Sequence, residues 1–104
     1  MMLSFIIPAL DRNHELDRCI AAIQAANPLA ELYEIIVICP SQAVKNIQAA
    51  FPMVRVVVET KKSIYGAMND GIRAAKGEFV YFLGQDDMVL SGFEKLIREL
   101  EDDV

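Results

Sequence analysis

Two patterns of apolar residues alternate along the chain. Continuous apolar runs, rich in β-branched residues, occupy positions 3–7, 35–39, 53–58 and 79–83. Such runs, without alternating polar residues, are typical of strands that are covered on both faces of a parallel sheet. Between the runs, apolar residues recur at helical spacing. The pattern therefore predicts strands and helices in alternation.

Capping residues and prolines set the expected ends of the helices. The first helix should begin near Asn13 and end at the Asn27-Pro28 pair, because proline disfavours helix at the residue before it. Ser41 is expected to cap the second helix. Ser63 should open the third helix and Gly77 should terminate it. The expected apolar face of the third helix consists of Ile64, Ala67, Met68, Gly71, Ile72 and Ala75.

A fourth helix is predicted near the end of the chain, where Ser91 and Glu94 form a capping box. The resulting β-α-β-α-β-α-β-α order implies a parallel sheet with right-handed crossovers. Such crossovers bring every strand-to-helix loop to one edge of the sheet. Residues 8–13, 39–41, 59–63 and 84–91 should therefore meet at that edge, which is where α/β folds bind ligands.

Composition limits the class of protein. The chain has 104 residues, 54% hydrophobic and 24% charged, which predicts one folded domain over residues 1–104. Its net charge of −5 makes nucleic acid an unfavourable partner. The sequence shows no signal peptide and no apolar run long enough for a transmembrane segment, so we expect a cytoplasmic location, with peripheral attachment to the inner face of the membrane left open. Cys19 and Cys39 are expected to be buried free thiols.

The candidate chemistry lies in Asp86 and Asp87, which follow the fourth predicted strand. Paired carboxylates at this edge could hold Mg²⁺ or Mn²⁺ against a phosphate, although two Asp residues in a loop are also common as solvated turn residues. The chain contains neither GxGxxG nor GxxxxGK[ST]. Rossmann dehydrogenases and P-loop NTPases are thereby disfavoured.

Three segments resemble the nucleotide-binding half of a family 2 glycosyltransferase of the GT-A fold. The strands at 4–8 and 34–38 resemble the first two strands of that family. The most specific match is Ile64-Tyr-Gly-Ala-Met-Asn-Asp-Gly-Ile72, with Ala75-Lys-Gly-Glu78 and Phe82-Leu-Gly-Gln-Asp-Asp87 after it. The resemblance implies a three-layer, Rossmann-like α/β sandwich on a four-stranded parallel sheet in the order 3-2-1-4, truncated relative to the whole family domain.

The resemblance also implies roles for particular residues. Asp87 would be the metal ligand of a DxD-like motif, with Mg²⁺ or Mn²⁺ as the cofactor. The ligand would be a nucleotide-diphospho-sugar, and the family's common setting is polysaccharide synthesis. The donor-binding residues would be Pro8, Leu10, Asp11, Arg12, Asn69 and Asp86.

The chain also departs from the family pattern. Cys39-Pro-Ser41 stands where the family has Asp-Asp-Gly-Ser, whose carboxylate accepts a hydrogen bond from the base. Gly66 replaces an Asp, Asp70 a Lys, and Lys61 a common Asp. Lys61 and Lys62 could help to hold a diphosphate, or form a solvated pair. No residue matches the general base, so no catalytic residue is assigned, and the acceptor half of the family's domain is not matched.

Three functions are consistent with these observations. The first is an inverting glycosyltransferase, or the donor-binding half of one. The second is a non-catalytic nucleotide-binding or assembly module that forms a homodimer through the edge of the fourth strand, since an apolar edge invites pairing. The third is a receiver-like or phosphotransfer domain, which would share the Asp cluster but would not explain the match over residues 64–72.

Overall fold

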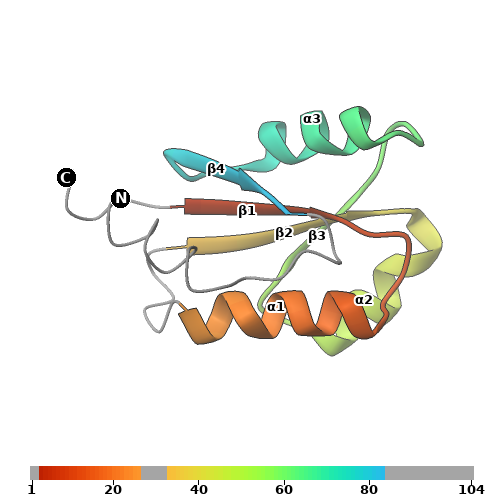
Figure 1. The fold of residues 1–104 in the computed structure, drawn as a ribbon. Helices are drawn as coiled ribbons and strands as arrows, with labels where there is room; N and C mark the ends of the chain where they lie inside the picture. The colour runs from red at the N-terminus through yellow and green to blue at the C-terminus, as the bar shows by residue number, and fades with distance from the viewer. Residues whose placement is uncertain (1–2, 27–32, 84–104) are drawn as a thin grey trace.

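The computed structural model describes residues 3–26 and 33–83. The strands are β1 (Leu3–Pro8), β2 (Tyr33–Cys39), β3 (Arg55–Val58) and β4 (Phe79–Phe82). The helices are α1 (His14–Ala26), the short 3-10 turn η2 (Ser41–Ala43), α2 (Val44–Ala50) and α3 (Ile64–Ala74). Strands and helices alternate as predicted, and Figure 1 shows the helices packed on both faces of the sheet.

The four strands form one parallel sheet in the order β3-β2-β1-β4, which confirms the predicted order. β1 is central and pairs Phe5 with Ile35 on one side and with Tyr81 on the other. β1 and β2 are almost entirely buried, as their continuous apolar sequences predict. This strand order places β1 and β2 in the middle of the sheet, where helices cover both faces.

The two faces of the sheet bury different residues because side chains alternate along each strand. On the face that α1 and α2 cover, Phe5 and Ile7 pack with Leu16 and Ile20 of α1 in the larger core. On the other face, Ile6 packs with other apolar side chains in a smaller core under α3. The remaining buried members of this second core are Ile36, Ile38 and Ala67. The arrangement is the three-layer α/β sandwich that the resemblance implies (Figure 1).

A glycine allows α3 to lie close to the sheet. A Cβ atom added to Gly71 would lie 2.3 Å from Cγ2 and 2.8 Å from Cδ1 of Ile6, which is fully buried in β1. No side chain fits at that distance without a shift of the helix or of Ile6. Gly71 therefore sets the spacing between α3 and the central strand.

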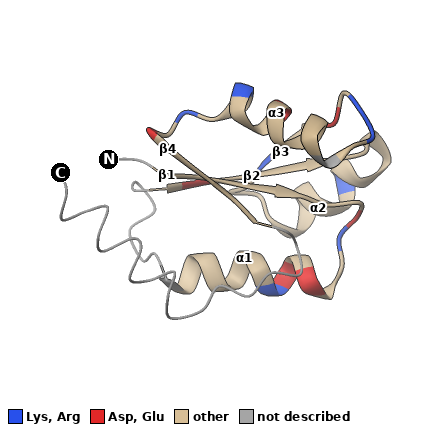
Figure 2. Ribbon diagram, turned by 45° about the horizontal axis from the view of Figure 1, so that its top comes forward, with Lys and Arg blue, Asp and Glu red and all other residues tan. Residues whose placement is uncertain are grey.

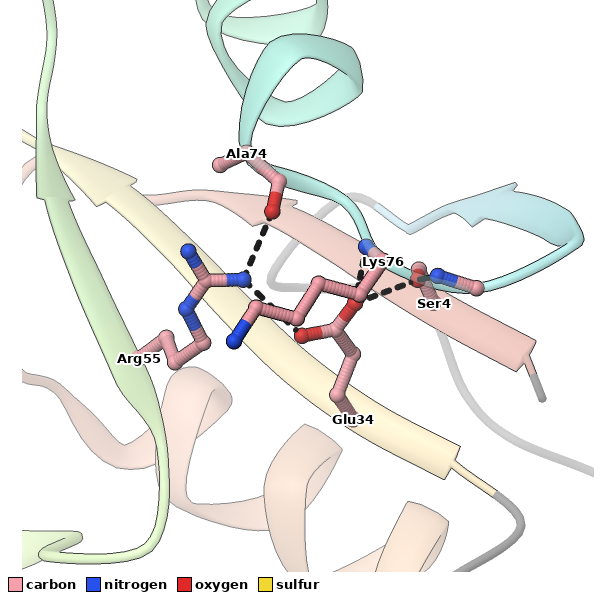
Figure 3. A network of polar contacts seen from close by, with 6 residues as sticks. Ser4, Glu34, Arg55, Ala74 and Lys76 are labelled. Carbon is pink, nitrogen blue, oxygen red and sulfur yellow. Dashed lines mark hydrogen bonds and ion pairs between the residues drawn. The ribbon is translucent and has the colours of Figure 1, made fainter.

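A polar network joins the strands at the amino-terminal end of the sheet (Figure 3). The Glu34 carboxylate accepts hydrogen bonds from the Ser4 hydroxyl at 2.7 Å, from Arg55 Nη1 at 3.0 Å and from the Lys76 N–H at 2.6 Å. Arg55 Nη1 also donates to the Ala74 carbonyl at 2.6 Å. Burial alone would raise the pKa of Glu34, but the bonds from Lys76, Ser4 and Arg55 together lower it. The network ties β1, β2 and β3 to the chain that leaves α3.

Two predicted helix caps are wrong. Ser41 does not cap a helix, because Pro40 occupies the N-cap position of η2 and no side chain caps it. Gly77 does not end α3: the C-cap is Ala75 in extended conformation, and no described glycine has a positive φ. Instead, the Gly77 N–H donates to the Ser4 hydroxyl at 2.9 Å, so this glycine belongs to the network around Glu34.

Other expectations are confirmed or refined in detail. The first and third helices begin where expected: Asn13 accepts a bond from the Leu16 N–H, and Ser63 accepts one from the Gly66 N–H, so each residue caps its helix. The third strand begins at Arg55 rather than at residue 53, and Ile72 is 51% exposed rather than part of the inner face of α3. The helix predicted after Ser91 lies outside the described residues.

Cys19 and Cys39 are buried free thiols, as predicted. Among the described helices, none is both long and apolar enough to cross a membrane.

Candidate functional site

The loops after β1, β2 and β3 lie next to one another at the carboxyl-terminal edge of the sheet. Backbone hydrogen bonds continue the ladders past the strand ends: the Ala9 N–H donates to the Ile38 carbonyl at 2.9 Å, and the Glu59 N–H donates to the Cys39 carbonyl at 2.9 Å. On the other side of β1, the Leu83 N–H donates to Ile6 at 3.0 Å. These bonds confirm that the first three of the predicted strand-to-helix loops meet at one edge, while the fourth, residues 84–91, lies outside the described residues.

A cavity of about 460 Å³ opens at this edge, between the ends of β1 and β2 and the first turn of α3. Its volume is within the range of small-molecule sites in proteins. The floor and walls are largely apolar, with a few polar groups among them. The lining residues are Pro8, Ala9, Leu10, Ile38, Pro40, Gln42, Glu59, Lys62, Ser63 and Ala67.

The long polar side chains of the cavity are not used by the fold. Among the residues that the structure describes, none forms a hydrogen bond or ion pair with the side chains of Gln42, Glu59 or Lys62. Ser63 also lines the cavity, but its hydroxyl is already engaged, because it accepts the hydrogen bond that caps α3. Lys61 and Lys62 are exposed in the loop before α3, which forms a blue segment in Figure 2, and only Lys62 lines the cavity.

A buried carboxylate holds the loop between β3 and α3 in position. Asp70 is 4% exposed, and it accepts bonds from the Thr60 N–H at 2.8 Å and from the Thr60 hydroxyl at 2.9 Å. Arg73 also pairs with it, one turn along α3. The bond from the Thr60 N–H, with those from the Thr60 hydroxyl and Arg73, lowers the pKa of Asp70 despite the opposing effect of burial. Asp70 does not line the cavity. By holding Thr60, it fixes the loop that carries Glu59 and Lys62.

β2 ends at Cys39, and Pro40 follows it in the lining of the cavity. Burial raises the pKa of the Cys39 thiol, and the nearby carboxylates of Glu59 and Asp11 raise it further. A buried thiol with a raised pKa stays protonated, so it offers no nucleophile. Pro40 contributes an apolar ring and no N–H donor to the cavity.

The structure brings some of the predicted donor-binding residues to the cavity. Pro8 and Leu10 line it, whereas Asp11, Arg12 and Asn69 are exposed and do not belong to its lining. Asp11 accepts a bond from the Arg12 N–H, and the Arg12 guanidinium pairs with Asp17 on α1 at 3.2 Å. Asp86 and Asp87 lie outside the described residues.

Among the described residues, no group of three or more His, Cys, Asp or Glu side chains comes together, so this part of the chain offers no metal site. Sequence reasoning also missed Gln42 and Glu59 as lining residues. Both residues lie in or next to loops expected at the ligand edge, but only the pairing of β2 with β3 places Glu59 across from Pro40.

Comparison with known proteins identifies the family. Residues 4–104 match the family described as "Glycosyl transferase family 2", so the chain belongs to this family of glycosyltransferases. The search of curated protein sequences gives no match.

Solved structures share the fold. S. aureus TarS 1-349 superposes with a TM-score of 0.72 at 18% identity, over 99% of this chain and 33% of TarS 1-349. The mannosyltransferase PcManGT from Pyrobaculum calidifontis, in complex with GDP-Man and Mn²⁺, gives a TM-score of 0.74 at 18% identity, over 95% of this chain and 31% of that protein. The chain thus has a GT-A, Rossmann-like fold and spans about a third of the length of these two structures.

Proposed function

We propose that this chain binds the nucleotide-diphospho-sugar donor of a family 2 glycosyltransferase. The observation that supports the proposal best is the cavity at the carboxyl-terminal edge of the sheet, where Gln42, Glu59 and Lys62 have no partner among the described residues. Polar groups that the fold does not use, on apolar walls, are what a site needs to orient a ligand. The family match supplies the class of ligand.

Each side of the cavity suits a different part of a nucleotide. Pro8 and Leu10 present apolar surface against which a base and ribose can pack. Lys62, beside the first turn of α3, can neutralise a phosphate, and the positive end of the helix dipole adds to this effect. We assign Asp11, Arg12, Asn69 and Asp86 to the periphery of the donor and Asp87 to the metal.

A bound Mg²⁺ or Mn²⁺ ion would stabilise the charge that develops on the departing nucleoside diphosphate. Structures of the same fold support a nucleotide ligand: PcManGT is in complex with GDP-Man and Mn²⁺, and TarS 1-349 is in complex with UDP or with UDP-GlcNAc. Polysaccharide synthesis is the setting we propose for the transfer.

The proposal is tested by titrating the chain with nucleoside diphosphates in the presence of Mg²⁺ while recording amide chemical shifts. We expect shifts at Ala9, Leu10, Lys62 and Ser63, which surround the cavity. Amides around Glu34, at the opposite end of the sheet, should not move and serve as an internal control. Asp87→Ala should weaken binding. Absence of shifts at millimolar nucleotide would contradict donor binding.

A homodimer through β4 is a second candidate, either alongside donor binding or instead of it. β4 pairs with β1 on one side, and Phe79, Val80 and Phe82 are 43%, 37% and 37% exposed. An apolar edge strand favours pairing with another copy of itself. Sedimentation should then show a dimer that Val80→Lys converts to a monomer. A monomer at high concentration without the substitution would contradict this candidate.

A further inference from the structure

The cavity has one carboxylate among its described lining residues, and that carboxylate belongs to Glu59. Its position follows from the sheet. Cys39 pairs with Val58 across β2 and β3, and the Glu59 N–H continues the ladder with a bond to the Cys39 carbonyl. Glu59 therefore lies across from Pro40, and both residues line the cavity. Thr60, the next residue, is held by Asp70, so the backbone that presents Glu59 is anchored on both sides.

The carboxylate of Glu59 is available to a ligand. Within the described ranges, no hydrogen bond or ion pair reaches it, and Lys62 is not within ion-pairing distance. An ionised carboxylate is an acceptor only, with two oxygens side by side that suit two parallel donors. Opposite it, Pro40 has no N–H to donate. This part of the cavity therefore presents two acceptor oxygens, from Glu59, and no backbone donor from Pro40.

These two features distinguish among the nucleic acid bases. Guanine has two adjacent donors, N1–H and the N2 amino group, which match both oxygens of a carboxylate. Uracil has one N3–H between two carbonyl groups, so a carboxylate there needs neighbouring donors, and Pro40 provides none. Adenine and cytosine each place an unprotonated ring nitrogen beside their amino group, which repels a carboxylate. Gln42 lines the same cavity and offers an amide donor for O6 of guanine.

We propose that Glu59 reads the base of the donor and that the cavity selects guanine over uracil, adenine and cytosine. This inference rests on the proposed function, since it names the nucleotide class of the same site. A bidentate pair of this kind discriminates between bases by roughly tenfold or more. A site whose polar groups are left unpaired by the wrong ligand rejects that ligand strongly.

The test measures affinities of GDP, IDP, UDP and ADP for the purified chain with Mg²⁺ by calorimetry. IDP is GDP without the N2 amino group, so it removes one of the two proposed bonds and leaves the rest of the nucleotide unchanged. We expect GDP to bind about tenfold more tightly than IDP, and UDP and ADP to bind more weakly than GDP. This ranking in the unaltered chain requires no variant.

Glu59→Gln should reduce the ratio of GDP to IDP affinity to near one, because an amide presents one acceptor instead of two. Glu78→Gln makes the same change of charge at an exposed residue just before β4 and should leave the ratio unchanged. Equal binding of GDP and IDP, or tighter binding of UDP, would overturn the inference and leave donor binding intact. An equal loss of all four nucleotides in Glu59→Gln would also overturn it. If no diphosphate binds, the proposed function fails as well.

Discussion

The two ends of the sheet use polar residues in opposite ways. At the amino-terminal end, Glu34 is almost buried, with 9% of its side chain exposed, and its carboxylate receives three hydrogen bonds from separate segments. At the carboxyl-terminal end, Glu59 lies beside a cavity and receives none from the described residues. Both carboxylates adjoin the same pair of strands, at their opposite ends.

The difference separates residues that hold the fold from residues that are free for a ligand. A buried charge must be paired, because an unpaired one costs several kcal/mol. The Glu34 network meets this requirement within the protein. A half-buried carboxylate on a cavity wall has water in place of a partner and can exchange that water for a ligand. The pairing of each polar side chain is therefore a better guide to function here than its charge.

The largest effect should come from Glu34→Ala. This change leaves the Ser4 hydroxyl and the Lys76 N–H without their acceptor and removes the partner of Arg55. Hydrogen bonds to charged groups contribute about 1.5–3 kcal/mol each, but Arg55 is partly exposed and recovers water, so we expect a loss of about 3 kcal/mol in the free energy of unfolding. Urea denaturation measures it. Glu78→Ala, at an exposed site, should change stability by less than about 0.5 kcal/mol. Similar losses in both variants would mean that the network does not stabilise the fold.

A smaller effect is expected from Gly71→Ala, with Gly66→Ala as its matched control on the same helix. Both changes add helix propensity of about 1 kcal/mol. At Gly71 the new methyl group would lie 2.3 Å from Ile6, so we expect a net loss of about 1–2 kcal/mol. At Gly66 it would meet Ser63 Oγ at 2.9 Å and Lys61 Cβ at 3.0 Å, which belong to exposed side chains rather than to a fully buried one, so we expect a smaller loss. Thermal unfolding should rank Gly71→Ala below Gly66→Ala. The reverse order would show that α3 is not held close to β1 by Gly71.

The sequence was sufficient to predict most of the fold, because apolar runs and helical periodicity reflect burial directly. The alternation of strands and helices is confirmed, and so are the expected starts of the first and third helices near Asn13 and at Ser63. The strand order is confirmed too, but it came from the family resemblance. Gly77 was misassigned for a physical reason. A glycine after a helix usually adopts a positive φ, but here its N–H donates to Ser4, a residue 73 positions away in sequence. The local sequence around Gly77 gives no sign of a contact with so distant a residue.

The candidate site was predicted only in part. Pro8 and Leu10, which the resemblance implied, line the cavity because Pro8 ends the central strand and Leu10 lies two residues beyond it. Glu59 was missed, since nothing local distinguishes one glutamate after a strand from a solvated one. Its role depends on the register between β2 and β3, which places it across from Pro40. Asp70 shows the converse case: a charge in a matched motif proved to be buried and paired with Thr60.

The ionisation of Glu34 should make the stability of the fold depend on pH. Because the pKa of Glu34 is lower in the folded protein than in the unfolded chain, its contribution is fully present above about pH 4.5 and is lost as the pH falls through the folded value. Unfolding free energy should therefore decrease below about pH 4.5. Glu34→Gln should lose stability at pH 7 and show a shallower decrease on acidification. An unchanged acid profile in Glu34→Gln would assign the pH dependence to other carboxylates, such as Asp70, whose pKa is also lowered.

The smallest effect on stability is expected from Glu59→Gln. No described residue bonds to this carboxylate, so its replacement by an amide of the same shape breaks nothing in the fold, and the free energy of unfolding should change by less than about 0.5 kcal/mol. Comparing it with Glu34→Gln by urea denaturation under the same conditions tests the contrast between the two ends directly, since the chemical change is identical. A loss in Glu59→Gln as large as that in Glu34→Gln would show that Glu59 supports the fold. A negligible loss means that any change in nucleotide binding by Glu59→Gln reports on the cavity itself, because the scaffold that presents residue 59 is intact.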